Sequence, residues 1–217
     1  MKRHFALLAS LAALACARAD LVIEQKIEGA DQTASLSTLK MKGTKLRVDV
    51  RNAAGAVSTI LDLETGESLT LLHSEKLALK RSAVETKEAI DAVRKRTGSG
   101  GNLEPTKTVA MGRKEKVGEW NADVFTTKGG AGPRTLWVTS DLPNWAKVKE
   151  QFDKIGKLPV AIPKKGVAPE APPPGVVVKT EIEAAGKTFT STIVSVEEED
   201  LDAALFAAPE DYRETTK

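Results

Sequence analysis

The sequence has few of the side chains that most often bind metals or act as nucleophiles. Its 217 residues include one cysteine, Cys16, and two histidines, His4 and His73. Cys16 and His4 lie in a leader that we expect to be removed, so the rest of the chain would have no thiol and no disulfide. A Ser-His-Asp site or a histidine-rich zinc site would have to be built around His73 alone. We expect His73 to be a partly buried strand residue, with a catalytic or ligand role as the alternative.

Aromatic residues and long apolar runs are also scarce. Aromatic side chains make up 4% of the chain and include three tryptophans, Trp120, Trp137 and Trp145. A chain with so few large side chains needs them in its core, so we expect core tryptophans rather than stacking platforms for sugars. After the leader, no segment approaches the roughly 20 consecutive apolar residues that a transmembrane helix needs.

The first 19 residues have the pattern of a signal peptide. The chain starts MKRHFALLASLAALACARAD, with a basic beginning, a short apolar run and small residues at positions 17 and 19. This pattern predicts cleavage after Ala19 and an exported protein, periplasmic or secreted, that begins at Asp20. The alternative is a lipoprotein signal in which Cys16 is acylated and anchors the protein to the outer membrane, although Ala13 stands where such signals usually have leucine.

The charge that remains after cleavage is close to balanced. The leader holds three basic residues and no acidic ones, which leaves 29 basic against 30 acidic residues. A nearly neutral chain without a basic stripe is a poor match for nucleic acid or for an anionic membrane surface. We therefore expect no nucleic-acid partner.

Two stretches resemble ligand-binding motifs but lack the residues that such motifs need. The glycine-rich stretch 98–102 is not followed by the Lys-Ser/Thr of a phosphate-binding loop. The acidic stretch 197–202 lacks the alternating Asp pattern of a calcium loop. We therefore expect no metal, no cofactor and no catalytic residue.

An apolar residue at every second position predicts that most of the chain forms β-strands. The clearest strand is 45–51, where Leu46, Val48 and Val50 share one face and charged residues share the other. Just before it, the apolar phase slips by one residue around Ser37-Thr38, which predicts a β-bulge that bends the sheet. Further strands are predicted at 57–63, 68–73, 107–116, 119–127, 134–139, 176–184 and 188–196.

Three segments are predicted to be helical instead. Ser82 and Glu85 have the spacing of a capping box and predict a helix that ends before residue 98. Trp145, Val148, Phe152 and Ile155 are spaced as one face of a second helix, preceded by Pro143. Ser140 or Asp141 is expected to cap that helix, so Asp141 is not expected to act as a general acid or base. The acidic stretch that begins at residue 197 predicts a short third helix that continues to residue 206.

The predicted order is five strands, a helix, three strands, a helix, a loop, two strands and a short helix. Residues 20–217 then form one domain, with a proline-rich loop at about 158–175. This order predicts an α+β fold in which a curled antiparallel sheet, a half-barrel, carries two or three helices on its concave face.

Several turns and anchors of this sequence resemble those of a known superfamily. They are KGTKLRVD (42–49), ILDLETG (60–66), LWVTSDLP (136–143) and LDAALFAAPEDY (201–212). On these segments the chain resembles periplasmic lipoprotein carriers and their outer-membrane receptor, and more closely an uncharacterised family of exported bacterial proteins in that superfamily. The resemblance implies a half-open barrel whose cavity, between sheet and helices, takes up acyl chains.

We therefore predict a non-catalytic, exported binding protein that holds an apolar ligand, a lipid or a lipidated segment. Two alternatives are an envelope protein-protein interaction module that uses the sheet edge or the proline-rich loop, and a sugar-binding or hydrolytic domain. The predicted cavity lining is Leu46, Val48, Val50, Leu69, Leu71, Trp120, Val124, Leu136 and Trp145.

Overall fold

The computed structural model describes residues 20–29, 34–52, 55–96, 107–128, 133–156, 174–184 and 186–216. The expected signal peptide and nearly all of the proline-rich loop lie outside these ranges. The described strands are β1 (Asp20–Glu28), β2 (Ala34–Lys42), β3 (Lys45–Asn52), β4 (Gly55–Asp62), β5 (Ser68–Leu72), β6 (Leu77–Arg81), β7 (Lys107–Val117), β8 (Trp120–Lys128), β9 (Arg134–Thr139), β10 (Val176–Ala184), β11 (Lys187–Glu199) and β12 (Arg213–Thr216). The helices are α1 (Ala83–Arg96), α2 (Trp145–Gly156) and the short 3-10 helix η1 (Ala203–Phe206).

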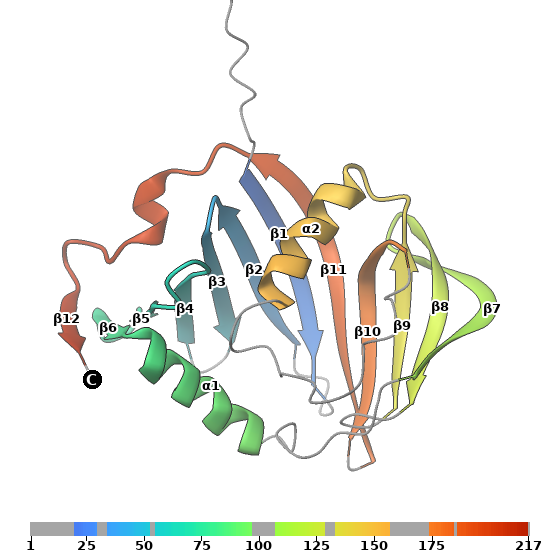
Figure 1. The fold of residues 1–217 in the computed structure, drawn as a ribbon, viewed down its shortest axis with the longest axis horizontal. Coiled ribbons are helices and arrows are strands. Elements are labelled where there is room, and N and C mark those ends of the chain that lie inside the picture. The colour runs from blue at the N-terminus through green and yellow to red at the C-terminus, as the bar shows by residue number, and fades with distance from the viewer. Residues whose placement is uncertain are drawn as a thin grey trace, which may run out of the picture.

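All twelve strands belong to one sheet, in the order β12-β6-β5-β4-β3-β2-β1-β11-β10-β9-β8-β7. Neighbouring strands are antiparallel except β12, which runs parallel to β6. The sheet curls around α1 and α2, which lie on its concave side, and its two edge strands do not meet (Figure 1). The predicted α+β half-barrel is confirmed, with two α-helices on the concave side.

Side chains alternate between the two faces of the sheet, as the pleat requires. On β3, Leu46 and Val48 contact the main core on the concave side. Arg47 and Asp49 point to the convex side, where they meet Ser58 of β4. The predicted phase of this strand is therefore confirmed.

The main core fills the concave side where α2 lies across the sheet. Val148 of α2 is 1% exposed and Leu142, in the turn before it, is 2% exposed. Trp145 and Phe152 pack against the same core from α2, whereas the side chain of Ile155 lies outside the described residues. The predicted helical face thus buries its apolar side on the sheet, and each fully buried side chain of this size contributes about 1.5–3 kcal/mol.

A second core lies on the convex side, beneath the C-terminal segment. Leu201 and Phe206 pack there against sheet residues such as Ile60 and Leu71, the last of which is fully buried. The prediction of a helix from residue 197 is wrong: β11 runs to Glu199, and only the four residues of η1 are helical. This short helix covers the convex face because the sheet is apolar there as well.

The predicted bulge at Ser37-Thr38 is also wrong. β2 pairs without a break with both β1 and β3 in this region. Ser37 takes an inward position at 4% exposure, and Leu36 points out at 62% exposure, so an exposed leucine produced the false slip in phase. The break in register between β1 and β11 lies at Glu24/Gln25 instead.

Two strands, β6 and β12, were not predicted. β6 follows a four-residue turn after β5, so six strands, not five, precede α1. β12 has four exposed residues and is held by its backbone pairing with β6 rather than by buried side chains. A strand of this kind leaves no alternating apolar pattern in the sequence.

Asp141 does not cap α2. Its Oδ2 accepts hydrogen bonds from the backbone N (3.2 Å) and Nδ2 (3.0 Å) of Asn121, which ties the start of β8 to the end of β9. The helix begins later, at Trp145, after Asn144 in a left-handed conformation (φ 54°). The buried Leu142 holds the intervening turn in the core, which explains the delayed start. The expected capping role is wrong, and the bonds that Asp141 forms tie two strands together.

Candidate functional site

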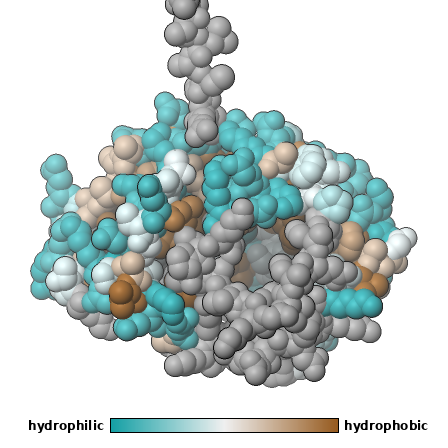
Figure 2. Space-filling view, in the orientation of Figure 1, coloured by the Kyte–Doolittle hydropathy of each residue, from teal (hydrophilic) through white to brown (hydrophobic). Residues whose placement is uncertain are grey.

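The concave face of β3 to β6 carries a partly exposed apolar surface. Its members are the inward-facing residues Val50, Val57, Leu61, Leu72, Leu77 and Leu79, called here the concave patch. Four of them form one row across the strands, because Val50 is opposite Val57, Val57 opposite Leu72, and Leu72 opposite Leu77. All six are incompletely buried, and Val57 is 38% exposed. Figure 2 shows scattered areas of apolar surface on this side of the molecule, among mostly polar surface.

The alternation of the strands keeps most charged residues away from the concave patch; within the described residues, Arg81 at the end of β6 is the exception. The charged residues of β3 and β4, and Lys80 of β6, point to the convex side or lie at strand ends. Between the apolar side chains, the inward positions hold uncharged hydroxyl residues such as Thr59 and Thr70. The face therefore offers an apolar surface with a few neutral hydrogen-bonding groups, which is typical of sites for small apolar ligands.

Helix α1 touches this half of the sheet mainly at its first turns. The capping box is confirmed, since the Ser82 N donates to Glu85 Oε2 (2.8 Å) and the Glu85 N donates to Ser82 Oγ (3.4 Å). Thr86, 5% exposed, is hydrogen-bonded to Ser68 of β5 (2.8 Å). Val84 is 67% exposed, so this apolar side chain of α1 does not cover the sheet as Val148 of α2 does.

The other half of the concave side is filled by the protein's own side chains. Trp120 and Trp137 are each 5% exposed, which agrees with their expected core role. The Trp137 Nε1 donates to Glu115 Oε2 (2.8 Å), and Lys179 Nζ lies 4.2 Å from the centre of the Trp137 ring. These tryptophans have no free ring face to offer a sugar.

The nine predicted lining residues do not form one surface. Leu46, Trp120 and Val124 are buried inside the main core, and Val48 and Trp145 pack against it. Val50 alone belongs to the concave patch. Leu69 and Leu71 lie in the second core on the convex side. Leu136 points to the opposite side of β9 from the core residue Trp137.

The misplaced residues have two causes. Around Leu136 both phases of the strand are apolar, so alternation alone does not say which phase faces the helices. Leu69 and Leu71 form the more apolar phase of β5, but this phase faces the second core on the convex side. The five patch residues that were missed lie on β4, β5 and β6. Val57 and Leu61 could have been found, because they share a phase in β4 and pair with β3, whose phase was clear.

A polar cluster on the convex side includes His73, the one histidine among the described residues. The Ser58 Oγ donates to Asp49 Oδ1 (2.5 Å) and accepts from Arg47 Nη2 (3.0 Å). His73 Nε2 lies 2.7 Å from the same Oγ, and its Nδ1 lies 2.6 Å from the hydroxyl of Tyr212. A pocket of about 540 Å³ opens beside this cluster.

The hydrogen bonds of this cluster differ from those of a hydrolase. Because the single hydroxyl hydrogen of Ser58 goes to Asp49, His73 Nε2 is left to donate to Ser58. A catalytic histidine must instead accept the serine proton and be held by the carboxylate. Ser58 is also 1% exposed. The cluster joins β3, β4 and the C-terminal segment, and this arrangement favours the expected structural role of His73.

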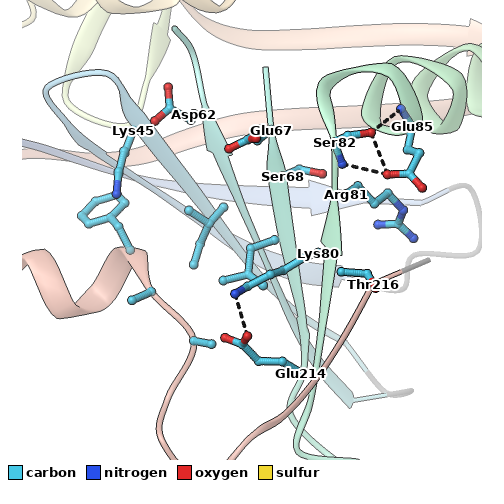
Figure 3. Close-up of a pocket in the computed structure, with 15 residues that line it drawn as sticks. Lys45, Asp62, Glu67, Ser68, Lys80, Arg81, Ser82, Glu85, Glu214 and Thr216 are labelled. Carbon is cyan, nitrogen blue, oxygen red and sulfur yellow. Dashed lines mark hydrogen bonds and ion pairs between the residues drawn. The ribbon is translucent and has the colours of Figure 1, made fainter. Parts of the chain in front are cut away.

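A second pocket, of about 630 Å³, lies where the ends of β4, β5 and β6 meet the C-terminal segment (Figure 3). Both positively and negatively charged side chains line this pocket. Lys80 Nζ and Glu214 Oε2 form an ion pair (2.6 Å) that joins β6 to β12, and Glu85 is bonded to Ser82. No group of three or more metal-ligating side chains was found among the described residues.

The Asp49 carboxylate joins Lys40, Arg47 and Ser58 on the convex side. Burial acts to raise its pKa, but hydrogen bonds from Lys40, Ser58 and Arg47 outweigh this effect and hold the pKa below its ordinary value. A depressed pKa means that the carboxylate stabilises the fold at pH values above its unfolded-state pKa. This contribution is lost as the pH falls through the folded-state pKa.

We predict that Asp49→Asn lowers the free energy of unfolding at pH 7 by about 1–3 kcal/mol, because Lys40 and Arg47 lose their shared counter-charge. The variant should also lose part of the acid-dependent decrease in stability below about pH 4. Urea unfolding between pH 3 and pH 7 measures both effects. The control is Asp153→Asn, which removes an exposed i,i+4 ion pair with Lys149 and should change stability little. Equal pH profiles for the wild type and Asp49→Asn would contradict the prediction.

Comparisons with known proteins bear on the fold and the family. A family model described as "Domain of unknown function (DUF4412)" matches residues 22–212. No curated protein matches the sequence. In the described part of the chain, no helix combines the length and apolar character needed to span a membrane.

Three solved structures are similar in fold. An uncharacterized conserved protein from Thermus thermophilus matches 92% of this chain and 91% of its own, with a TM-score of 0.54 and 10% identity. LprF from Mycobacterium bovis matches 88% of this chain and 90% of its own (TM-score 0.39, 8% identity). PNGF-II matches 92% of this chain but only 32% of its own (TM-score 0.41, 10% identity). The first similarity supports the fold alone, and the other two are too distant to bear on function.

Proposed function

The chain belongs to the DUF4412 family, and from this premise we propose that it is an exported, non-catalytic binding protein whose concave patch holds an apolar ligand, a lipid or a lipidated segment. The observation that carries the proposal is the partly exposed, uncharged apolar surface on the concave side of β3 to β6. An apolar surface of this kind is stabilised when a ligand removes it from water, by roughly 25 cal/mol per Å².

The unequal filling of the hollow supports this proposal. Over β1, β2 and β11 the side chains of α2 complete a packed core, and residues such as Ile23 are fully buried. Over β4 to β6 the inward residues stay partly exposed, although the same sheet continues. A fold that needed only a core would gain stability by covering these residues too.

The sheet edges give less support to strand addition by a partner protein. The edge strand β7 has a break in its register between Ala110 and Lys114, and it is rich in lysine and arginine. Such bulges and charges discourage pairing with a further strand. The opposite edge, β12, is only four residues long.

Export is the second part of the proposal. The first described strand begins at Asp20, the residue that would follow the signal peptide. The Asp20 carboxylate accepts hydrogen bonds from Lys42 Nζ (2.6 Å) and from the backbone N of Leu201 (3.1 Å). The folded domain therefore engages the chain directly from the predicted cleavage point.

We predict that the full-length protein, expressed in a bacterium with both signal peptidases, is recovered from the periplasm with an intact mass that begins at Asp20. An acylated chain that begins at Cys16 would instead support the lipoprotein alternative. An unprocessed chain confined to the cytoplasm would contradict export.

We predict that the purified protein takes up a fluorescent fatty-acid analogue and that Val57→Asp lowers its affinity at least tenfold. A carboxylate placed in the concave patch would lose its hydration when the ligand binds. The matched control is Leu36→Asp, which places the same charge at an exposed apolar position on the convex side of β2 and should leave affinity unchanged. Equal affinity of Val57→Asp and the wild type, or the absence of uptake by the wild type, would overturn the proposal.

A further inference from the structure

One charged side chain lies on the concave face of β3 to β6 within the described part of the chain. Arg81, the last residue of β6, is opposite Ser68 and shares its face with Leu79, a member of the concave patch. Its Nη1 donates a hydrogen bond to the Thr70 hydroxyl (3.2 Å). Thr70 is opposite Leu79, so this bond draws the guanidinium toward the patch.

The hydrogen-bonding capacity of Arg81 is largely unused within the described residues. A guanidinium has five N–H donors, and here it has one protein partner, the neutral Thr70. No carboxylate of the described residues forms an ion pair with it, although the side chain is only partly exposed. The neighbouring Lys80 differs: it points to the convex side and is paired with Glu214, apart from Arg81 (Figure 3).

Carboxylates that line the same pocket as Arg81 have other roles. Glu85 bonds the amide and hydroxyl of Ser82 at the start of α1. Glu67 lies in the turn between β4 and β5 and is exposed. A partly buried cation without a counter-ion, beside an apolar surface, is the arrangement expected where an anionic group arrives with a ligand.

The row of apolar residues provides a path away from this cation. From β6 to β3 the row crosses three strand spacings, or about 14 Å. It runs through Leu77, Leu72 and Val57 to Val50. The row begins at Leu77, which lies four residues, or about 13 Å, along β6 from Arg81, with Leu79 between them. A ligand with a charged head at Arg81 would therefore lay the first part of its apolar tail over Leu79 and Leu77 and reach the row with its far end.

We propose that the ligand is an amphiphile with an anionic head, a carboxylate or a phosphate, which Arg81 binds while the tail lies on the concave patch. This inference rests on the proposed function and names the chemistry of its ligand. Arginine is suited to the head because its planar fork donates two parallel hydrogen bonds to a carboxylate or phosphate. The neighbours of Arg81 on this face of the sheet, Ser68, Thr70 and Leu79, are uncharged, while Glu67 and Glu85 line the same pocket at the strand ends.

The test compares three ligands with the same C16 chain: palmitate, hexadecyl phosphate and hexadecanol, each kept below the concentration at which it aggregates or separates from water. The wild type should bind at least one of the two anions about tenfold or more tightly than the alcohol. Arg81→Gln should remove this preference and leave the affinity for hexadecanol unchanged. The anion whose affinity falls more in the variant identifies the head as carboxylate or phosphate.

Two further variants make the result specific. Arg51→Gln removes another arginine without an ion pair among the described residues, from the convex side of β3, and should change none of the three affinities. Arg81→Lys keeps the charge but removes the fork, so it should retain only part of the preference for the anion. It also provides the readout if Arg81→Gln does not fold.

The outcomes separate the two proposals. Equal binding of all three ligands by the wild type, or an equal loss of all three in Arg81→Gln, would overturn the role of Arg81 and leave the apolar site standing. Failure of the wild type to bind any of the three would overturn the proposed function itself.

Discussion

The structure depends on the burial of two apolar faces of a single curled sheet. Each row of inward side chains has an outward row beside it, and in β1 both rows contain buried apolar residues, whereas in β4 and β5 the buried apolar residues face the convex side. One layer of helices covers only one face. The chain therefore uses α2 for the concave side and the segment around η1 for the convex side, and the hydrogen bonds of Asp20, Arg47 and Tyr212 fasten that segment to the sheet.

This division of the covering elements explains why the concave patch stays partly exposed. On the convex side, even the short C-terminal segment brings Leu201 and Phe206 into a closed cluster. On the concave side, α2 closes one half of the hollow, and among the described side chains of α1, Thr86 is bonded to Ser68 in the other half. The charged residues of β3 and β4 are kept on the convex side, so the surface left partly open is apolar, with Arg81 at its border.

Sequence patterns predicted the structure correctly where they were unambiguous. The clean alternation of β3 and the Ser82/Glu85 capping box led to the correct strand phase and helix start, and the order of elements led to the half-barrel. The sequence was insufficient at Leu69 and Leu71, whose apolar phase is clear, because only the tertiary fold shows that the C-terminal segment covers the face on which they lie. The start of α2 was also missed, since the packing of Leu142, not the local capping preference of Asp141, sets it. Arg81 left no sequence signal, because its position relative to the patch depends on the pairing of β5 with β6.

Native mass spectrometry of the mature protein, purified from a bacterial envelope fraction without detergent, tests the central claim most directly. The proposed function predicts a complex with one acyl-chain molecule, released by organic extraction and reduced in a parallel preparation of Val57→Asp. A protein that is consistently empty, and that stays empty after incubation with lipid extract, would contradict a ligand-binding role for the concave patch.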